Sequence, residues 1–278
     1  MYRPSELSRF LQDLGIHAKK GLSQNFLIDG NVVRKIVATA KVAPGDVVLE
    51  IGPGPGALTE ALLEAGAHVI AVEMDTVLAK ALERFRTRDR QLDIVTADIL
   101  EVSVEELLKP HLADGRRAKV IANLPYHVTT PILTRLAPLD DLLQSVTVMV
   151  QKEVAERMTS PAGSKVYGSL SVFLCFYATP HYAFTVSRKC FSPTPKVDSA
   201  VVHLDITGPR KVSNKDRFFQ MTRTAFEHRR KMLRASLKEL YSADIVTKAL
   251  EALKMNVLAR PEDLSIEELI DLFEYLQS

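Results

Sequence analysis

Long hydrophobic runs are absent from this 278-residue chain, although 46% of its residues are hydrophobic. No stretch approaches the roughly 18 consecutive apolar residues that a membrane-spanning helix needs, so we expect no membrane partner. The first nine residues also lack an apolar signal region, which predicts a cytoplasmic protein. The hydrophobic residues are instead numerous enough to form the core of one large domain, or of a domain with an appendage.

Cysteine is scarce as well, since the chain contains only Cys175 and Cys190. The two could form one disulfide, but without a secretory signal we expect reduced, buried thiols. The seven histidines do not fall at metal-ligand spacing with one another or with cysteine along the chain. We therefore predict no metal site.

The net charge of +2 conceals a strong asymmetry along the chain. Residues 208–240 carry ten Lys/Arg against three Asp/Glu, whereas residues 241–278 carry three against eight. The first 41 residues are also basic, with seven Lys/Arg against three Asp/Glu. Such blocks suit binding to a polyanion, but they are equally typical of ordinary solvated helix faces. Charge alone does not decide between these two interpretations.

Short β-branched runs alternate with helical stretches of about ten residues, which predicts a parallel, doubly wound α/β sheet. The expected strands are 47–51, 68–74, 92–97, 119–124 and 146–151, and the expected helices are 58–65, 76–85, 132–136 and one starting at 152. Two further β-rich runs, 182–188 and 200–206, indicate an antiparallel edge.

Beyond Gly208-Pro209 the chain reads as helix only, with helices expected at roughly 214–238, 243–254 and 264–277. Gly208-Pro209 is therefore the expected domain boundary. We predict a catalytic domain over residues 1–207 and a small all-α domain over residues 208–278.

A glycine-rich turn, Gly52-Pro53-Gly54-Pro55-Gly56, follows the first expected strand. Ligands of doubly wound sheets bind outside the carboxyl ends of the strands, where glycine permits tight turning and close approach. With Ala57, the turn also satisfies the relaxed dinucleotide pattern, so the glycines alone do not exclude NAD. Its two prolines remove backbone donors that a pyrophosphate would use, which favours a ligand without phosphates, such as S-adenosylmethionine.

Polar side chains end the next strands of the expected sheet. Glu73 ends the second strand, 21 residues after Gly52, where an acid can bind two ribose hydroxyls. Asp98 ends the third strand, where it can reach an adenine amino group, and Asn123 ends the fourth. Either acid alone would be read as a surface carboxylate or a helix cap. Polar groups at successive strand ends instead favour a cofactor site.

The segment Asn123-Leu124-Pro125-Tyr126 offers a carboxamide, two carbonyls around a proline and an aromatic face. The adenine N6 lone pair is delocalised into the ring, so this amine is a poor nucleophile. The Asn123 carboxamide oxygen and the carbonyl of Leu124 or Pro125 can accept both of its N–H bonds. That arrangement would aim the lone pair at a sulfonium methyl, by orientation and electrostatics and without a metal. The segment predicts methyl transfer onto a nucleobase.

A base held in a stack must leave it to reach such a site. Tyr126 and Phe191 could replace the lost stacking, at about 1–3 kcal/mol for each aromatic partner. Core packing is the alternative role for Phe191. The prolines that flank it favour a rigid, exposed loop.

These motifs, in this order, resemble the ribosomal RNA adenine N6,N6-dimethyltransferase family, and within it the small-subunit enzymes. The resemblance begins at Gln24-Asn25-Phe26-Leu27, continues through 151–154, 191–199, 225–226 and 229–231, and covers nearly the whole chain. It implies a class I, Rossmann-like methyltransferase with a small C-terminal all-α domain. It also implies that the methyl donor contacts Asn25, Leu27, Gly52, Glu73, Asp98 and Asn123, and that Asn123 to Tyr126 and Phe191 hold the target base.

A set of basic residues falls three, four and seven apart within the expected helix 214–238, so several can share one face. The set consists of Arg223, Arg229, Arg230, Lys231 and Arg234. We expect these side chains to contact RNA phosphates.

The resemblance implies dimethylation of N6 on two adjacent adenosines in a hairpin loop near the 3′ end of 16S rRNA. The expected partner is this rRNA within the small ribosomal subunit, the expected donor is S-adenosylmethionine, and the expected state is a monomer. Two alternatives stay open: a large-subunit rRNA adenine methylase, and a non-catalytic ribosome-assembly or transcription factor. The basic helical tail and the loop 191–199 favour the small-subunit enzyme, and intact Glu73, Asn123 and Tyr126 argue against a non-catalytic protein.

Overall fold

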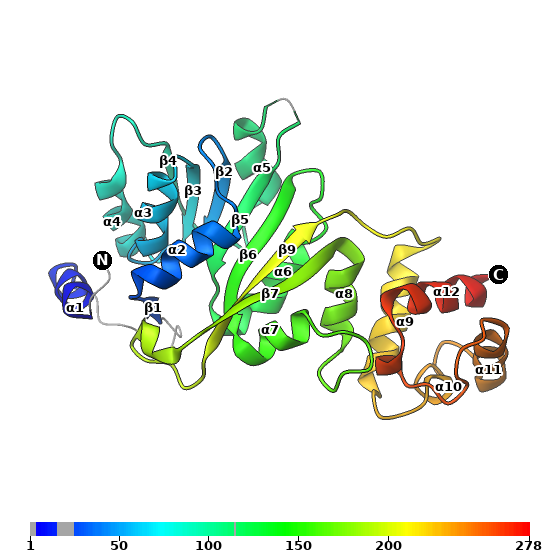
Figure 1. The fold of residues 1–278 in the computed structure, drawn as a ribbon. Helices are drawn as coiled ribbons and strands as arrows, with labels where there is room; N and C mark the ends of the chain where they lie inside the picture. The colour runs from blue at the N-terminus through cyan, green and yellow to red at the C-terminus, as the bar shows by residue number, and fades with distance from the viewer. Residues whose placement is uncertain (1–3, 16–24, 114) are drawn as a thin grey trace. The chain divides into compact units, whose positions relative to one another are not determined.

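The computed structural model describes residues 4–15, 25–113 and 115–278 (Figure 1). The chain divides into two compact units, one made of Met1–Ala155 and Pro180–Thr207, the other of Glu156–Thr179 and Gly208–Ser278. The division expected from the sequence differs from these units in one respect. Residues 156–179 group with the second unit, although the sequence assigned them to the first domain.

The first unit is built on a seven-stranded sheet with the strand order β4-β3-β2-β5-β6-β9-β7. The strands are β2 (Val47–Ile51), β3 (His68–Glu73), β4 (Leu92–Thr96), β5 (Ala118–Asn123), β6 (Leu143–Gln151), β7 (Ala178–Val186) and β9 (Ser199–Ile206). Strands β2 to β6 pair in parallel, and β9 pairs antiparallel with β6. The predicted doubly wound sheet with an antiparallel edge is therefore confirmed.

Helices flank this sheet (Figure 1). The helices of this unit are α1 (Pro4–Asp13), α2 (Gly30–Thr39), α3 (Ala57–Glu64), α4 (Thr76–Ala81), η2 (Leu82–Phe85), α5 (Val104–Leu108), η3 (Lys109–His111), η4 (Tyr126–Val128), α6 (Thr129–Leu136) and α7 (Lys152–Met158), which passes into the second unit. Of these, α1 packs against Phe26 and Leu78 and not against the sheet. Every residue of β2 is buried, as expected for a central parallel strand that is covered on both faces. Asp75 caps α4 by accepting hydrogen bonds from the backbone amides of Val77 and Leu78.

A second, two-stranded sheet was not expected from the sequence. It pairs β1 (Phe26–Leu27) antiparallel with β8 (Phe191–Ser192), so that Leu27 lies opposite Phe191. The Ile28 amide extends the pairing by donating to the Cys190 carbonyl over 2.9 Å. Two residues are too short a run to show the alternation that marks a strand.

The second unit is helical throughout. Its elements are α8 (Ser169–Tyr177), α9 (Lys215–Glu227), α10 (Leu233–Ser236), α11 (Ala243–Ala252), η6 (Pro261–Asp263) and α12 (Ile266–Gln277). Three fully buried phenylalanines join three of these helices: Phe176 of α8 stacks on Phe218 of α9 at 5.4 Å, and Phe218 meets Phe273 of α12 edge-on at 5.6 Å. These aromatic contacts explain why residues 156–179 group with the C-terminal helices.

The predicted single helix over 214–238 was wrong. Helix α9 ends at Glu227, and α10 begins only at Leu233. Tertiary contacts draw the intervening chain away from the helix axis. The guanidinium of Arg229 donates to the Ser164 carbonyl over 3.1 Å and lies 3.7 Å from the Glu262 carboxylate, while the Leu233 amide donates to the Ala259 carbonyl.

The structure also bears on the predictions about the two cysteines and about membrane-spanning helices. Cys175 and Cys190 are both free thiols, as predicted, but they are partly exposed rather than buried. No helix in the described part of the chain is long and apolar enough to cross a membrane.

Candidate methyl-donor and base site

The candidate site lies at the carboxyl ends of the central parallel strands. The chain moves from β2 outward to β3 and β4 and then returns to β5 on the other side of β2, so the strand order reverses between β2 and β5. A crevice forms at such a reversal, and ligands bind in it. Ile51 of β2 lies opposite Ala122 of β5, which places the next residues, Gly52 and Asn123, side by side.

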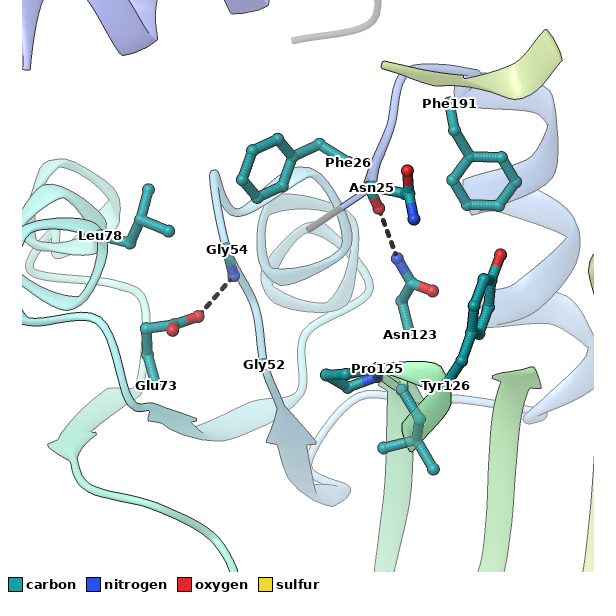
Figure 2. A pocket seen from close by; sticks show the side chains of 11 residues that line it. Asn25, Phe26, Gly52, Gly54, Glu73, Leu78, Asn123, Pro125, Tyr126 and Phe191 are labelled. Atoms are coloured by element: carbon teal, nitrogen blue, oxygen red, sulfur yellow. Dashed lines mark hydrogen bonds between the residues drawn. The ribbon is translucent and has the colours of Figure 1, made fainter. Parts of the chain in front are cut away.

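All of the predicted cofactor and base residues line one group of cavities in this crevice. One cavity is lined by Asn25, Gly52, Glu73, Asn123, Leu124, Pro125, Tyr126 and Phe191 (Figure 2). A neighbouring cavity of about 410 Å³ shares Gly52, Glu73 and Pro125 and adds Asp98. A third shares Gly52 and Asn123 and adds Leu27.

The glycine turn serves both packing and access. Gly52 has a φ of 65°, and a Cβ added there would meet no atom within 4 Å, so a ligand can approach this backbone closely. Gly56 has a φ of 82°, but a Cβ there would collide with the Phe85 ring and lie 2.8 Å from Leu82. Gly56 is therefore required for packing against η2, whereas Gly52 leaves space for a ligand.

Glu73 is held in place by the backbone. Its Oε2 accepts a hydrogen bond from the Gly54 amide and its Oε1 accepts one from the Asp75 amide, each over 2.9 Å. The residue is 7% exposed. Burial raises the pKa of the Glu73 carboxyl, and the two amide hydrogen bonds partly offset that increase. Each oxygen keeps acceptor capacity for a further donor, such as a ribose hydroxyl.

The 410 Å³ cavity is lined mainly by apolar residues, and its polar lining residues include Glu73 and Asp98. Asp98 lines it and uses Oδ1 to accept a hydrogen bond from the Leu100 amide over 2.9 Å. Two of the apolar side chains at the wall, Met74 and Val77, are 57% and 42% exposed. A flat aromatic base with an exocyclic amine would cover this apolar surface and offer its amine to Asp98.

Glu50 was not singled out as a site residue from the sequence, yet it is the most unusual group here. It is the fourth residue of β2, it is 1% exposed, and it lines the cavity that also contacts Gly52 and Asn123. Neither carboxylate oxygen has a hydrogen-bond partner among the described residues. Burial raises the pKa of Glu50 to about 8; the hydroxyl and amide of Thr59 lie near enough to lower it, without forming a hydrogen bond of ordinary geometry, and the Glu73 charge raises it further. An acid within an apolar strand run is the signal that could have identified it.

One hydrogen bond with the described residues orients the Asn123 side chain. Its Nδ2 donates to the Asn25 carbonyl over 3.3 Å. The carboxamide oxygen points to the side of the Tyr126 ring, as Figure 2 shows. No described residue donates to this oxygen, so it is available to accept a hydrogen bond from a ligand amine.

The structure distinguishes the two backbone carbonyls that the sequence left as alternatives. The Pro125 carbonyl accepts from the Val128 amide over 3.2 Å and from the Thr129 hydroxyl over 3.3 Å, which uses both of its lone pairs. The Leu124 amide donates to the Met149 carbonyl, while no donor among the described residues reaches the Leu124 carbonyl. The Leu124 carbonyl is therefore the acceptor that remains for a target amine.

Two aromatic side chains flank the Asn123 oxygen. The Tyr126 hydroxyl is 3.1 Å from the Ser199 hydroxyl, which fixes the ring at the cavity wall. Phe191 is only 2% exposed, so the predicted exposed loop was wrong for this residue. Pairing of β8 with β1 buries it, yet the ring still lines the cavity.

The five basic residues are not part of this site, and they do not share one helix face. Arg223 lies on α9, where its Nε donates to the Phe219 carbonyl, and Arg234 lies on α10. Arg229 is tied to Ser164 and Glu262 within the second unit. Arg230 and Lys231 are exposed and form no ion pair with the described residues.

A family model for ribosomal RNA adenine dimethylases matches residues 15–278 of this chain. The ribosomal RNA small subunit methyltransferase A of Protochlamydia amoebophila (strain UWE25) is 57% identical over 278 residues, covering 100% of this chain and 98% of that protein. Its namesake in Chlamydia felis (strain Fe/C-56) is 46% identical over 276 residues, covering 98% and 95%. The chain belongs to the ribosomal RNA adenine dimethylase family.

Solved structures agree with this assignment. The 23S rRNA methyltransferase ErmE superposes with a TM-score of 0.72 at 26% identity, covering 91% of this chain and 100% of that chain. A dimethyladenosine transferase from Plasmodium falciparum also gives a TM-score of 0.72, at 25% identity, covering 89% and 95%. The predicted class I, Rossmann-like methyltransferase fold with a C-terminal helical region is confirmed.

As a ribosomal RNA adenine dimethylase, the protein is an S-adenosylmethionine-dependent methyltransferase, and its cavities fit this donor. The open space at Gly52 admits a ligand against the backbone. The unpartnered oxygens of buried Glu50 suit the ammonium group of a methionine moiety, and Glu73 suits a ribose.

Glu50 generates a prediction about stability in the absence of donor. Its folded-state pKa of about 8 lies above the ordinary value of 4.5, so its contribution to stability is complete below pH 4.5 and is lost as the pH rises toward 8. We expect the free energy of unfolding to fall, relative to Glu50→Gln, by up to about 1.4 kcal/mol per pH unit across that window. Urea unfolding of both proteins from pH 5 to 8.5 measures the difference.

The exposed Glu64, at the end of α3, provides the matched control. Glu64→Gln is expected to follow the pH dependence of the unsubstituted protein. If the free energy of unfolding depended on pH in the same way for Glu50→Gln and for the unsubstituted protein, Glu50 would not be buried in its protonated form.

Proposed function

We propose that this protein dimethylates N6 of two adjacent adenosines in a hairpin loop near the 3′ end of 16S rRNA, within the small ribosomal subunit. We further propose that it acts in the cytoplasm as a monomer and serves small-subunit biogenesis. The proposed methylation of an adenine amine rests mainly on the orientation of the Asn123 side chain. Its carboxamide oxygen accepts from no described residue and points to the side of the Tyr126 ring, in the cavity that Phe191 also lines.

Donor binding is assigned to residues at the strand ends. Glu73 would bind the ribose hydroxyls, because its oxygens are fixed by two backbone amides and keep further lone pairs. Asp98, which lines the 410 Å³ cavity, would bind the adenine amine. Glu50 would accept hydrogen bonds from the donor's ammonium group, which adds a role to those expected from the sequence. Asn25 and Leu27 would complete the pocket from β1 and the residue before it.

The chemical step follows from two fixed acceptors. The Asn123 oxygen and the Leu124 carbonyl would each accept one N–H of the target amine, so that the nitrogen lone pair is no longer held in conjugation with the ring. Bound S-adenosylmethionine supplies an electrophilic methyl group on its sulfonium. The acceptors are in place before the reaction, so catalysis comes from orientation and electrostatic stabilisation. The new N–CH3 bond forms as the S–CH3 bond breaks, and N6 then releases a proton to water.

Tyr126 and Phe191 would hold the target base between them. The Tyr126 hydroxyl is bonded to Ser199, and Phe191 is fixed by β8, so neither ring needs to be ordered when the base arrives. This preorganisation supports capture of a base that has left its stack.

The two alternatives can be compared with the relatives. The structural likeness to a 23S rRNA methyltransferase is at 26% identity, whereas the two small-subunit relatives are 57% and 46% identical over nearly their full lengths. This difference favours the small subunit as substrate. The gathering of Glu73, Asn123 and Tyr126 around one cavity favours an enzyme over a non-catalytic assembly factor.

The substrate assignment is tested by mapping. Purified protein is incubated with labelled S-adenosylmethionine and with either small or large subunits that lack adenine dimethylation. We expect label as N6,N6-dimethyladenosine at two adjacent positions of 16S rRNA and none above background in 23S rRNA. Label in 23S rRNA alone would establish the large-subunit alternative, and no label in either would favour a non-catalytic role.

RNA contact by the second unit is tested separately. Each phosphate contact that is removed lowers the slope of log affinity against log salt concentration by about 0.7–0.9. Arg230→Gln/Lys231→Gln should therefore reduce the slope for small-subunit binding by about 1.4 to 1.8, with donor affinity unchanged. Lys248→Gln/Lys254→Gln removes the same charge from exposed positions in the acidic C-terminal region and should leave the slope as it is. If the two double variants gave equal slopes, Arg230 and Lys231 would be solvated surface residues that contact no phosphate.

A further inference from the structure

We propose that His68, Asp93 and His111 bind a divalent transition-metal ion, Zn²⁺ by the character of the ligands, at the end of the sheet opposite the methyl-transfer site. The prediction of no metal site rested on spacing along the chain, where these residues are far apart. The fold brings one ligand atom of each to within 4.8 Å of the others.

The strand register explains how the three side chains meet. His68 is the first residue of β3, and Asp93, on the edge strand β4, lies opposite Ile70. Ile70 and His68 are two residues apart, so their side chains and that of Asp93 project from the same face of the sheet. His111 ends η3 and approaches that face, with its ring edge-on to the His68 ring at 4.6 Å between centroids.

The donor atoms already converge. Asp93 Oδ2 is 2.5 Å from His68 Nε2 and 4.0 Å from His111 Nε2. Ligands of a tetrahedral zinc ion, bound at about 2.0–2.2 Å, lie roughly 3.3 Å from one another. The required movements are therefore about 1 Å or less for these two pairs. Asp93 is 47% exposed, so rotation of its side chain can supply much of that movement.

The chemistry of the three ligands points to zinc. Two imidazole nitrogens and one carboxylate oxygen suit Zn²⁺, while Mg²⁺ and Ca²⁺ prefer oxygen ligands throughout. The histidine side chains are 18% and 26% exposed, so the site is partly shielded but open to an incoming ion. Three protein ligands leave a fourth position for water.

Such a site would act on stability rather than on methyl transfer. It would join β3, the edge strand β4 and the turn that leads into β5. Glu73 lies five residues along β3 from His68, or about 16 Å at the rise of a strand. An ion that binds the folded protein alone shifts the folding equilibrium toward it.

The test uses untagged, metal-free protein titrated with Zn²⁺ by calorimetry, and with Co²⁺ by absorption. We expect one ion per chain, a Co²⁺ spectrum without thiolate charge-transfer bands, and an unfolding midpoint that Zn²⁺ raises by several degrees. His111→Gln should bind Zn²⁺ at least tenfold more weakly and lose the rise. It keeps the His68–Asp93 hydrogen bond and should fold and methylate as the unsubstituted protein does.

The control is His181→Gln, because His181 also faces an aspartate, Asp205 at 3.3 Å. That variant should bind Zn²⁺ as the unsubstituted protein does. The proposal is overturned if the unsubstituted protein binds no stoichiometric ion, if His111→Gln binds it equally well, or if His181→Gln weakens binding to the same extent.

Discussion

The parallel pairing of β2 with β5 is the constraint on which the site depends. The two strands are distant in sequence, and their register sets Gly52 beside Asn123 at the point where the strand order reverses. A shift of that register by one residue would turn every side chain of one strand to the opposite face. The cavity lined by Asn123 and Tyr126 and the 410 Å³ cavity share Gly52, Glu73 and Pro125 because these two strands end together.

Buried carboxylates give this crevice its electrostatic character. Glu50 and Glu73 are 1% and 7% exposed, and burial raises the pKa of both groups. Glu73 is supported by two backbone amides, whereas Glu50 has no hydrogen-bond partner among the described residues. An acid without a partner in the empty fold is costly, and a donor that carries a sulfonium and an ammonium would relieve the cost. The proposed contact of Glu50 with the donor would thus favour binding at a cost to the stability of the free protein.

Much of the fold and the site could be predicted from local sequence pattern. Strand ends marked by Gly52, Glu73, Asp98 and Asn123 were identified because β-branched runs end at turn residues and because parallel strands share an edge. Contacts between distant segments were not predictable in this way. They include the pairing of β1 with β8, which buries Phe191, and the break after α9. They also include the aromatic core that joins α8 to α9, and the approach of His111 to His68. In each case the decisive partner lies far along the chain, where periodicity carries no information.

The central claim is that the oriented Asn123 oxygen activates the target amine. The most direct measurement is single-turnover methyl transfer by Asn123→Ala with saturating donor and small-subunit substrate, beside a thermal melt of the variant. Among the described residues, the Asn123 side chain makes one hydrogen bond, to Asn25, so the variant should fold with a near-native melting temperature. Its methylation rate should fall by about 100- to 1,000-fold, the loss expected when one oriented group is removed from a transition state. Tyr126→Phe, which keeps the aromatic face, should lose much less. A folded Asn123→Ala protein that methylates at a near-native single-turnover rate would contradict the account.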